Sequence, residues 1–255
     1  MINSFYGYLG FAQGSFNDFS LAAQVTARGR EILANMSSFL AGSGARIIEM
    51  DTDGIYFTPP EGEEPESLES KIQEILPEGI TIELDAVFPA MYSYKAKNYA
   101  LLTAEGEIKL TGAALKSRGM ERYFRQVVKE IIRLKLTRQE ELIPAYHQNC
   151  RNAVAAHEIP LADLCKNETL NDTPANYKKK LDAGSTRRSA VYELLLKAER
   201  PGRVGDKIEF YITGTKAKPA VVDNSKLLSD NQGERDENTL FYLAKLDELF
   251  ATFGS

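Results

Sequence analysis

Two carboxylates stand close together in the segment Asp51-Thr52-Asp53-Gly54. Aspartates two positions apart on an extended segment point to the same side, so both can face one cation. The same residues also suit an ordinary tight turn, because an Asp can hydrogen-bond its own backbone and a Gly tolerates positive φ. Taken alone, these residues favour the structural turn, and a metal site depends on support from elsewhere in the chain.

The residues on either side of these carboxylates predict the element that positions them. Residues 46–50 and 55–57 are rich in β-branched and aromatic side chains, which indicates a β-hairpin with the carboxylates at its tip. A helix is expected over 18–40, where apolar residues recur at helical spacing, with Asp18 as the N-cap and Gly42-Ser43-Gly44 as the end. The aromatic, Gly-punctuated opening at 3–8 predicts the end of an element and a turn.

The remaining pattern predicts strands in the middle of the chain and helices after it. A short helix is expected over 66–76 and strands over 80–84, 99–102 and 108–110, with a turn at 104–107. A helix is expected from Gly119 to about residue 136, followed by a polar helical stretch, a strand over 207–212 and a last helix from about Glu237. The sequence thus predicts a mixed α+β part to about residue 120 and then a mostly helical part.

The composition is typical of a globular cytoplasmic protein. The 255 residues are 43% hydrophobic and 26% charged, and the sequence has neither a secretory signal nor an apolar run of membrane-spanning length, so no membrane partner is expected. Cys150 and Cys165 lack the spacing of a metal knuckle, which indicates a reduced, cytosolic setting. His147 and His157 are the only histidines and lie in a polar helical stretch, so they are expected to be solvated. A histidine metal site or a Ser/His/Asp triad is therefore not expected.

The charge is unevenly distributed along the chain. The net charge is −5, and residues 61–69 carry five glutamates and no basic residue, whereas residues 87–135 carry ten basic residues against four acidic ones. The basic stretch could follow a phosphate backbone. Two solvated surfaces would explain the pattern equally simply, and charge alone favours them.

Several segments, in order along the chain, resemble conserved motifs of family B DNA polymerases. Asn3-Ser4-Phe5-Tyr6-Gly7 resembles the Asn-Ser-x-Tyr-Gly motif, and the helical residues 21–30 resemble the segment that follows it. Asp51-Thr52-Asp53 is similar to the metal-binding Tyr-x-Asp-Thr-Asp-Ser motif, and Lys97-Asn98-Tyr99 to the Lys-x-Tyr element. Thr111-Gly112 with Ser117-Arg118 resembles the Lys-Gly…Arg-Arg segment before the thumb, and 205–210 and 236–249 look like the closing thumb segments.

The resemblance implies an α+β fold: a partial polymerase palm, made of an antiparallel sheet with helices, followed by a mostly helical thumb. The expected domains are the C-terminal tip of the fingers at 1–16, the palm at 17–119 and the thumb at 120–255. A nucleotide-binding Lys four residues before Asn3 would precede Met1, and the family's upstream aspartate motif is absent. The chain is therefore expected to be the C-terminal part of a polymerase. Glu49 stands where the family usually has Tyr, Gly54 where it has Ser, Ala96 where it often has Lys, and Thr111 where it has Lys.

The activity implied is template-directed nucleotidyl transfer from a dNTP to a primer 3′-hydroxyl, with two Mg²⁺ ions. Asp53 would be a direct metal ligand and Asp51 its partner nearer the primer end, although for Asp51 a purely turn-forming role stays open. With half of the carboxylate site missing, the isolated fragment is expected to bind the ions incompletely and to be inactive. Its expected partners are primer–template DNA, dNTP and the missing N-terminal part of the polymerase.

The resemblance also implies contacts to nucleotide and DNA. Asn3 and Tyr6 would line the pocket for the incoming nucleotide, and Lys97 would reach the primer minor groove with Tyr99 nearby. Arg118 would hold a backbone phosphate. The basic runs Lys178, Lys179, Lys180 and Arg187, Arg188 would grip duplex DNA without recognising its sequence.

Two other functions compete with a catalytic fragment. A non-catalytic palm–thumb module would clamp duplex DNA, and substitution of Asp53 would then leave the activity of the full-length protein unchanged. An unrelated α+β protein would use Asp51-Thr52-Asp53 only as a turn, and would show neither Mg²⁺-dependent behaviour nor affinity for duplex DNA at low salt.

Overall fold

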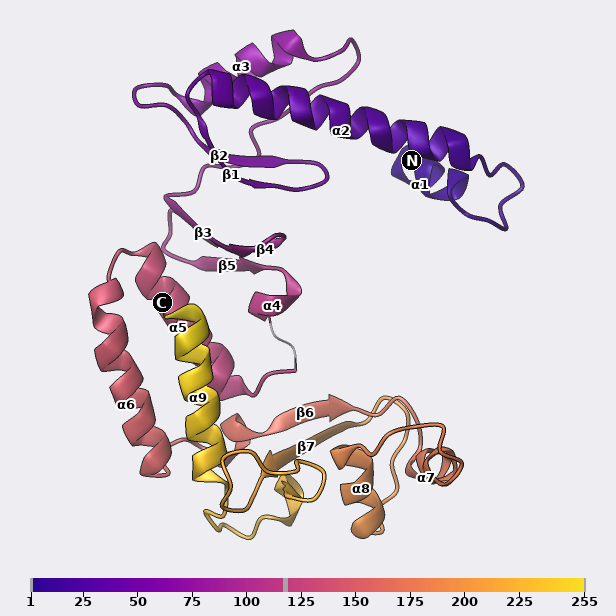
Figure 1. The fold of residues 1–255 in the computed structure, drawn as a ribbon, viewed down its shortest axis with the longest axis vertical. Coiled ribbons are helices and arrows are strands. Elements are labelled where there is room, and N and C mark those ends of the chain that lie inside the picture. The colour runs from indigo at the N-terminus through magenta and orange to yellow at the C-terminus, as the bar shows by residue number, and fades with distance from the viewer. Residues whose placement is uncertain (1, 117–118, 255) are drawn as a thin grey trace. The chain divides into compact units, whose positions relative to one another are not determined.

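The computed structural model describes residues 2–116 and 119–254, with the side chains of all of these except 2–5, 114 and 116. The chain divides into two compact units, residues 1–88 with 93–97 and residues 89–92 with 98–255. Figure 1 labels the helices and strands along the chain. The candidate carboxylates lie in the first unit, and each unit is described on its own.

Two helices, α1 (Ile2–Leu9) and α2 (Phe19–Gly42), open the first unit and pack against each other (Figure 1). The turn predicted at 3–8 is wrong, because the backbone continues as a helix to Leu9 before it turns at 10–17. The prediction for α2 is confirmed: Asp18 accepts a hydrogen bond from the Leu21 N–H at 2.8 Å, and the helix ends at Gly42 with Gly44 at a φ of 89°.

The predicted hairpin is present as β1 (Arg46–Met50) and β2 (Ile55–Thr58), paired antiparallel. The predicted short helix is α3 (Pro65–Ile75). The end of α2, the hairpin and α3 share a small apolar core, because Leu40, Leu68 and Ile72 are buried together and Ile47 and Phe57 pack against them. This core anchors the base of the hairpin and leaves its acidic tip at the surface.

The strand predicted at 80–84 is wrong. Among the described residues no strand pairs with this segment, and side chains of α3 bond its backbone groups instead. The Gln73 side chain donates to the Ile80 carbonyl at 2.9 Å and accepts from the Ile82 N–H at 3.1 Å, while Glu69 accepts from the Leu84 N–H at 3.2 Å. Ile82 still packs against the core, which explains the alternating apolar pattern that suggested a strand.

The second unit contains two three-stranded sheets. One has the order β3 (Ala90–Lys95), β4 (Asn98–Leu102) and β5 (Ile108–Thr111), of which residues 93–95 of β3 belong to the first unit. The predicted strands β4 and β5 and the turn between them are confirmed, whereas β3 was not predicted. The other has the order β6 (Lys166–Thr169), β7 (Lys207–Ile212) and β8 (Ser225–Leu227), of which only β7 was predicted.

Helices make up most of the rest of the second unit, as predicted. The long ones, α5 (Arg122–Leu136), α6 (Ile143–Ala155) and α9 (Thr239–Phe253), pack side by side (Figure 1). The short ones are α4 (Ala113–Lys116), α7 (Pro174–Asp182) and α8 (Ala190–Lys197). Single 3₁₀ turns lie at Glu140–Leu142, Leu161–Leu164 and Leu228–Asp230. The expected mixed α+β fold with a mostly helical second part is confirmed.

The core of the second unit joins its helices to the sheet that contains β7. Tyr242 of α9 is fully buried, its hydroxyl donates to the Leu164 carbonyl at 3.0 Å, and it accepts from the Ile212 N–H at 2.9 Å. Its ring stacks on that of Phe124 from α5 at 6.1 Å. A buried tyrosine whose hydroxyl is satisfied in this way ties two helices and a strand together.

Candidate active site

The tip of the β1–β2 hairpin is closed by the residues that the sequence singled out. The Asp51 N–H donates to the Gly54 carbonyl at 2.9 Å. The Asp51 Oδ1 accepts from the backbone N–H of Thr52 at 2.6 Å and from its hydroxyl at 3.2 Å. Asp51 therefore does order the turn, which was one of its two expected roles. Such bonds also fix the direction of the carboxylate, so the turn role does not compete with a ligand role.

Lys97 supplies a positive charge to this tip. Its ammonium lies 2.7 Å from the Asp51 Oδ1 and donates to the Thr52 hydroxyl at 3.2 Å. The hydrogen bond from Lys97, followed by the one from the Thr52 backbone, holds the pKa of Asp51 below its ordinary value. The same contact with Asp51 raises the pKa of Lys97. Both side chains are therefore charged at neutral pH, and 62% of the Lys97 side chain remains exposed to solvent.

Glu49 adds a third carboxylate, which holds the segment that carries Lys97. Its Oε1 accepts from the Lys97 backbone N–H at 2.9 Å, and its Oε2 accepts from the Ser93 hydroxyl at 3.0 Å. The sequence marked Glu49 as a departure from the family's usual Tyr and as an extra carboxylate that could alter the local charge. Its position two residues before Asp51 was the available signal, because residues i and i+2 of a strand share a face.

The donor set at the hairpin tip fits part of a magnesium site. Asp53 is exposed and accepts no hydrogen bond within the described part of the chain. Within the described residues, the donors to Asp51 reach its Oδ1, and its Oδ2 accepts no hydrogen bond. Carboxylate oxygens are the ligands that Mg²⁺ prefers. Among the described residues, however, no group of three or more His, Cys, Asp or Glu side chains is placed to hold a metal, so this chain offers part of a coordination sphere.

The predicted nucleotide- and DNA-contacting residues are spread over both units. Asn3 and Tyr6 lie on α1, where Tyr6 is 42% exposed and only the backbone of Asn3 is described. Tyr99 lies in β4 and is 6% exposed, so its ring is largely covered. Arg118 lies outside the described residues. Of these predicted contacts, Lys97 is the one that meets the carboxylates at the hairpin tip within the described residues.

The basic run at Lys178, Lys179 and Lys180 lies on α7, and all of its side chains are exposed. Lys180 pairs with Asp172 at 2.7 Å, and this contact, together with hydrogen bonds from the Asn176 side chain and the Thr173 N–H, lowers the pKa of Asp172 to about 2. Arg188 is likewise paired with Asp223 at 2.7 Å. Part of the basic charge predicted to face DNA is therefore engaged with acidic side chains of the same unit.

The sequence predicted that the two histidines are solvated, and this prediction is wrong because both make specific side-chain contacts. His147 bonds Asp247 at 2.8 Å and stacks on Phe250 at 4.1 Å between ring centres. His157 bonds Glu237 at 2.7 Å. Both face α9 or the segment before it, about 80 to 100 residues away in sequence, and such long-range contacts leave no local pattern.

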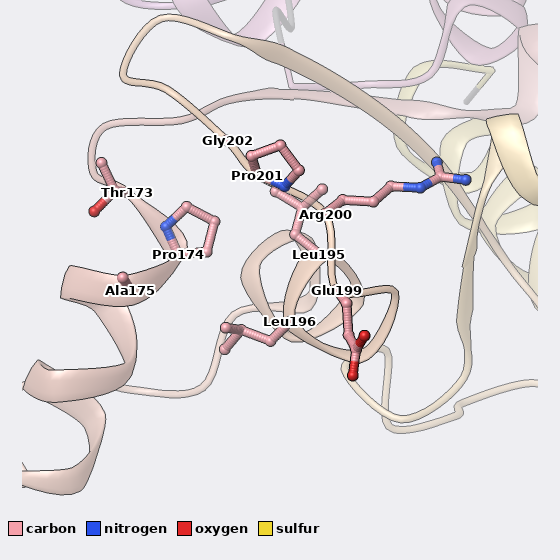
Figure 2. A pocket seen from close by; sticks show the side chains of 9 residues that line it. All are labelled: Thr173, Pro174, Ala175, Leu195, Leu196, Glu199, Arg200, Pro201 and Gly202. Atoms are coloured by element: carbon pink, nitrogen blue, oxygen red, sulfur yellow. The ribbon is translucent and has the colours of Figure 1, made fainter.

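A shallow pocket of about 480 Å³ in the second unit contains none of the predicted site residues (Figure 2). It lies where the start of α7, at Thr173 and Pro174, meets the end of α8, at Leu195 and Leu196. The guanidinium of Arg200 points away from Pro174 and is held by Ser229 and Asp230 at 2.5 Å each (Figure 2). The positive charge of Arg200 is therefore engaged outside the pocket.

Comparison with known proteins identifies the family. The sequence profile of DNA polymerase family B matches residues 1–250. The chain belongs to DNA polymerase family B. The match excludes an unrelated α+β protein and confirms the family that the motifs predicted.

Individual relatives of this family B chain include archaeal enzymes. "DNA polymerase 1" of Pyrococcus abyssi is 31% identical over 125 residues, which are 46% of this chain and 16% of that protein. The "DNA polymerase" of Thermococcus sp. (strain 9oN-7) is 25% identical over 229 residues, which are 81% of this chain and 29% of that protein. The chain thus spans less than a third of the length of these curated relatives.

The fold agrees with a solved family B polymerase, that of Pyrobaculum calidifontis. The structures superpose with a TM-score of 0.76 at 20% identity, over 98% of this chain and 32% of that one. Within the part of the chain that the structure describes, no helix combines the length and apolar character needed to cross a bilayer.

Proposed function

We propose that this chain takes part in template-directed DNA synthesis as a portion of a longer polymerase. Residues 1–16 would form the tip of the fingers, 17–119 part of the palm and 120–255 the thumb. The observation that carries the proposal is the placement of Asp51 and Asp53 at the exposed tip of a β-hairpin, in a chain matched by the family over residues 1–250. The resemblance of Asp51-Thr52-Asp53 to the family's metal-binding motif supports the assignment.

The reaction would be attack of a primer 3′-hydroxyl on the α-phosphorus of a dNTP, with pyrophosphate as the leaving group. Asp51 and Asp53 would hold Mg²⁺, which when bound lowers the pKa of the hydroxyl and stabilises charge on the leaving group. The chain's own contribution is to fix the Asp51 carboxylate and close the turn that carries Asp53, through the hydrogen bonds that Asp51 makes with Gly54 and Thr52. Such positioning and charge stabilisation need no histidine or nucleophilic side chain.

The other site residues would bind substrates. Asn3 and Tyr6 would line the nucleotide pocket, Lys97 would reach the primer minor groove with Tyr99 nearby, and Arg118 would hold a backbone phosphate. Lys178, Lys179 and Lys180 would contact duplex phosphates, which for Lys180 requires release from Asp172. The remaining metal ligands would come from the N-terminal part of the same polymerase, so the isolated chain is proposed to be inactive.

The test is primer extension by the complete polymerase with Asp53→Asn. Loss of one charged ligand is expected to lower the extension rate at least about a hundredfold, because the metal-assisted step depends on it. Binding of primer–template DNA, followed by fluorescence anisotropy, is expected to change by less than about threefold. Asp85→Asn is the matched control, since Asp85 is an exposed aspartate of the same unit outside the hairpin.

A non-catalytic duplex-binding module is the second candidate, and the contact between Lys97 and Asp51 favours it because a cation already occupies one carboxylate oxygen. Under that function, Asp53→Asn would extend primers at the rate of the unaltered polymerase while DNA binding stayed intact. That result would refute the catalytic assignment.

A further inference from the structure

A bulge in β1 turns Glu49 away from the core. Ile47 pairs with Phe57 and Glu49 pairs with Tyr56, so Ile48 is one extra residue on this strand. Ile47 and Phe57 pack against the core of the first unit. Opposite residues in a sheet share a face, and neighbours along a strand alternate. Glu49 therefore lies on the face of Tyr56, whereas a regular strand would have placed it on the face of Ile47.

After the bulge the strand alternates regularly, so Glu49 and Asp51 lie on the same side of the hairpin. Met50 pairs with Ile55, so the residues before and after Met50 both point away from the core. Residues 93–97, which belong to the same unit, meet both carboxylates there. The Lys97 backbone bonds Glu49 at 2.9 Å, and the Lys97 ammonium lies 2.7 Å from Asp51.

The backbone conformation of Lys97 needs stabilisation by hydrogen bonds such as those of Glu49. Its φ is 61°, in the left-handed region that non-glycine residues rarely adopt without local stabilisation. Glu49 uses its two oxygens on both sides of the turn, one on the N–H of Lys97 and one on the hydroxyl of Ser93. A carboxylate offers two separate acceptor oxygens for this purpose, whereas the tyrosine usual at this position in the family has a single phenolic oxygen.

We propose that Glu49 is a positioning residue for Lys97: by holding the turn at 93–97 it directs the Lys97 ammonium to the hairpin tip. That Lys97 then serves to bind the primer rests on the proposed function. The contacts of Glu49 with Lys97 and Ser93 do not depend on that function. Glu49 acts through Lys97, and its contribution is therefore distinct from that of the carboxylates at the tip.

The test uses nuclear magnetic resonance on the whole chain without DNA or nucleotide. In Glu49→Ala we expect hydrogen exchange at the Lys97 backbone amide to become about tenfold faster, because a hydrogen bond to a charged acceptor is lost. We also expect the Lys97 ammonium ¹⁵N signal, assigned by Lys97→Arg, to move toward its position in Asp51→Asn. Glu49→Gln keeps an acceptor oxygen and an amide that can bond Ser93. In this variant we therefore expect the Lys97 amide exchange rate and the Lys97 ammonium shift to stay close to those of the unaltered chain.

Two further variants keep the test decisive. Ser93→Ala removes one of the two anchors and should shift the Lys97 ammonium signal less than Glu49→Ala does. Glu69→Ala is the matched control, because Glu69 also accepts from a backbone N–H in the first unit, that of Leu84, away from the hairpin. It should leave both Lys97 signals unchanged. If Glu49→Ala does not fold, the Lys97 signals of Ser93→Ala and Glu49→Gln are compared with those of the unaltered chain instead.

An unchanged Lys97 ammonium signal in folded Glu49→Ala, or an equal change in Glu69→Ala, would overturn the inference. These signals are independent of polymerase activity. Normal extension by Asp53→Asn would refute the proposed function and leave the positioning of Lys97 intact, while an unresponsive Lys97 would refute the positioning and leave the proposed function intact.

Discussion

Glu237 is a carboxylate that depends on its partners, because its side chain is only 2% exposed. Arg235 donates to it from Nε at 3.0 Å, and His157 lies 2.7 Å from its Oε1. Burial by itself raises the pKa of Glu237, but the hydrogen bonds from Arg235 and then His157 outweigh burial and leave the pKa below its ordinary value. Folding therefore favours the charged form of this residue.

This lowered pKa predicts acid sensitivity of the second unit. The contribution to stability is fully present above the unfolded-state pKa, about 4.3, and is lost as the pH falls through the lower folded-state value. We expect Glu237→Gln to reduce stability at neutral pH and to flatten its decline below about pH 4, measured by urea unfolding at several pH values. Glu234→Gln is the control, since Glu234 is exposed. An equal decline in Glu237→Gln and the unaltered chain would contradict the assignment.

The residues of the candidate site were only partly predictable from the sequence. Asp51 and Asp53 were found because a turn motif is local, and its flanking strands carry their own pattern. The contact of Lys97 with Thr52 joins residues 45 apart, so no periodicity records it. The role of Glu49 depends on the bulge at Ile48, which changes the face of every later side chain in β1 and has no marker residue in the sequence.

At the scale of elements, a buried ion pair joins the start of α5 to α9. The Glu121 side chain is fully buried and pairs with Lys245, whose ammonium also lies 5.1 Å from the centre of the Phe124 ring. Within the described residues, the Glu121 Oε1 has no hydrogen-bond partner. Burial lowers the pKa of Lys245 more than Glu121 raises it. Removing either partner would therefore leave the other charge buried without a counter-charge, which lowers the free energy of unfolding.

We expect Lys245→Met to destabilise the second unit by about 3–5 kcal/mol, because it leaves the Glu121 carboxylate buried without a counter-charge. The double variant Glu121→Leu with Lys245→Met should recover most of this loss, since an apolar pair replaces an isolated charge. Urea unfolding measures both. Arg28→Ala, at the exposed Arg28–Glu31 pair, is the control and should change stability by less than about 1 kcal/mol. A double variant as unstable as the single one would refute this explanation.

Elements were predictable where a local signal agreed with the tertiary structure. The boundaries of α2 followed from the Asp18 cap and the terminal glycines, and α9 from its apolar periodicity. Strand β6 was missed because Lys166-Asn167-Glu168-Thr169 is polar and is held mainly by pairing with β7. The order of the three strands in that sheet is likewise set by contacts distant in sequence.

At the scale of the whole molecule, two units with separate cores predict two unfolding transitions. The core cluster of the first unit is small, with Leu40, Ala45, Leu68 and Ile72 as its buried members, and it should melt first. We expect Leu68→Ala to lower only the first transition by about 2–5 kcal/mol and Ile131→Ala to lower only the second, measured by differential scanning calorimetry. A single transition shifted by both substitutions would show that the units unfold together.

The side-chain bonds that Gln73 and Glu69 make to residues 80–84 also bear on solubility. Ile80-Thr81-Ile82 has the composition of segments that form intermolecular β-structure, and such a segment is an aggregation hazard when its backbone groups are free to pair with another molecule. Here the Ile80 carbonyl and the N–H groups of Ile82 and Leu84 are already bonded within the chain. Helix α3 thereby protects this extended segment against self-association, without a neighbouring strand to cover it.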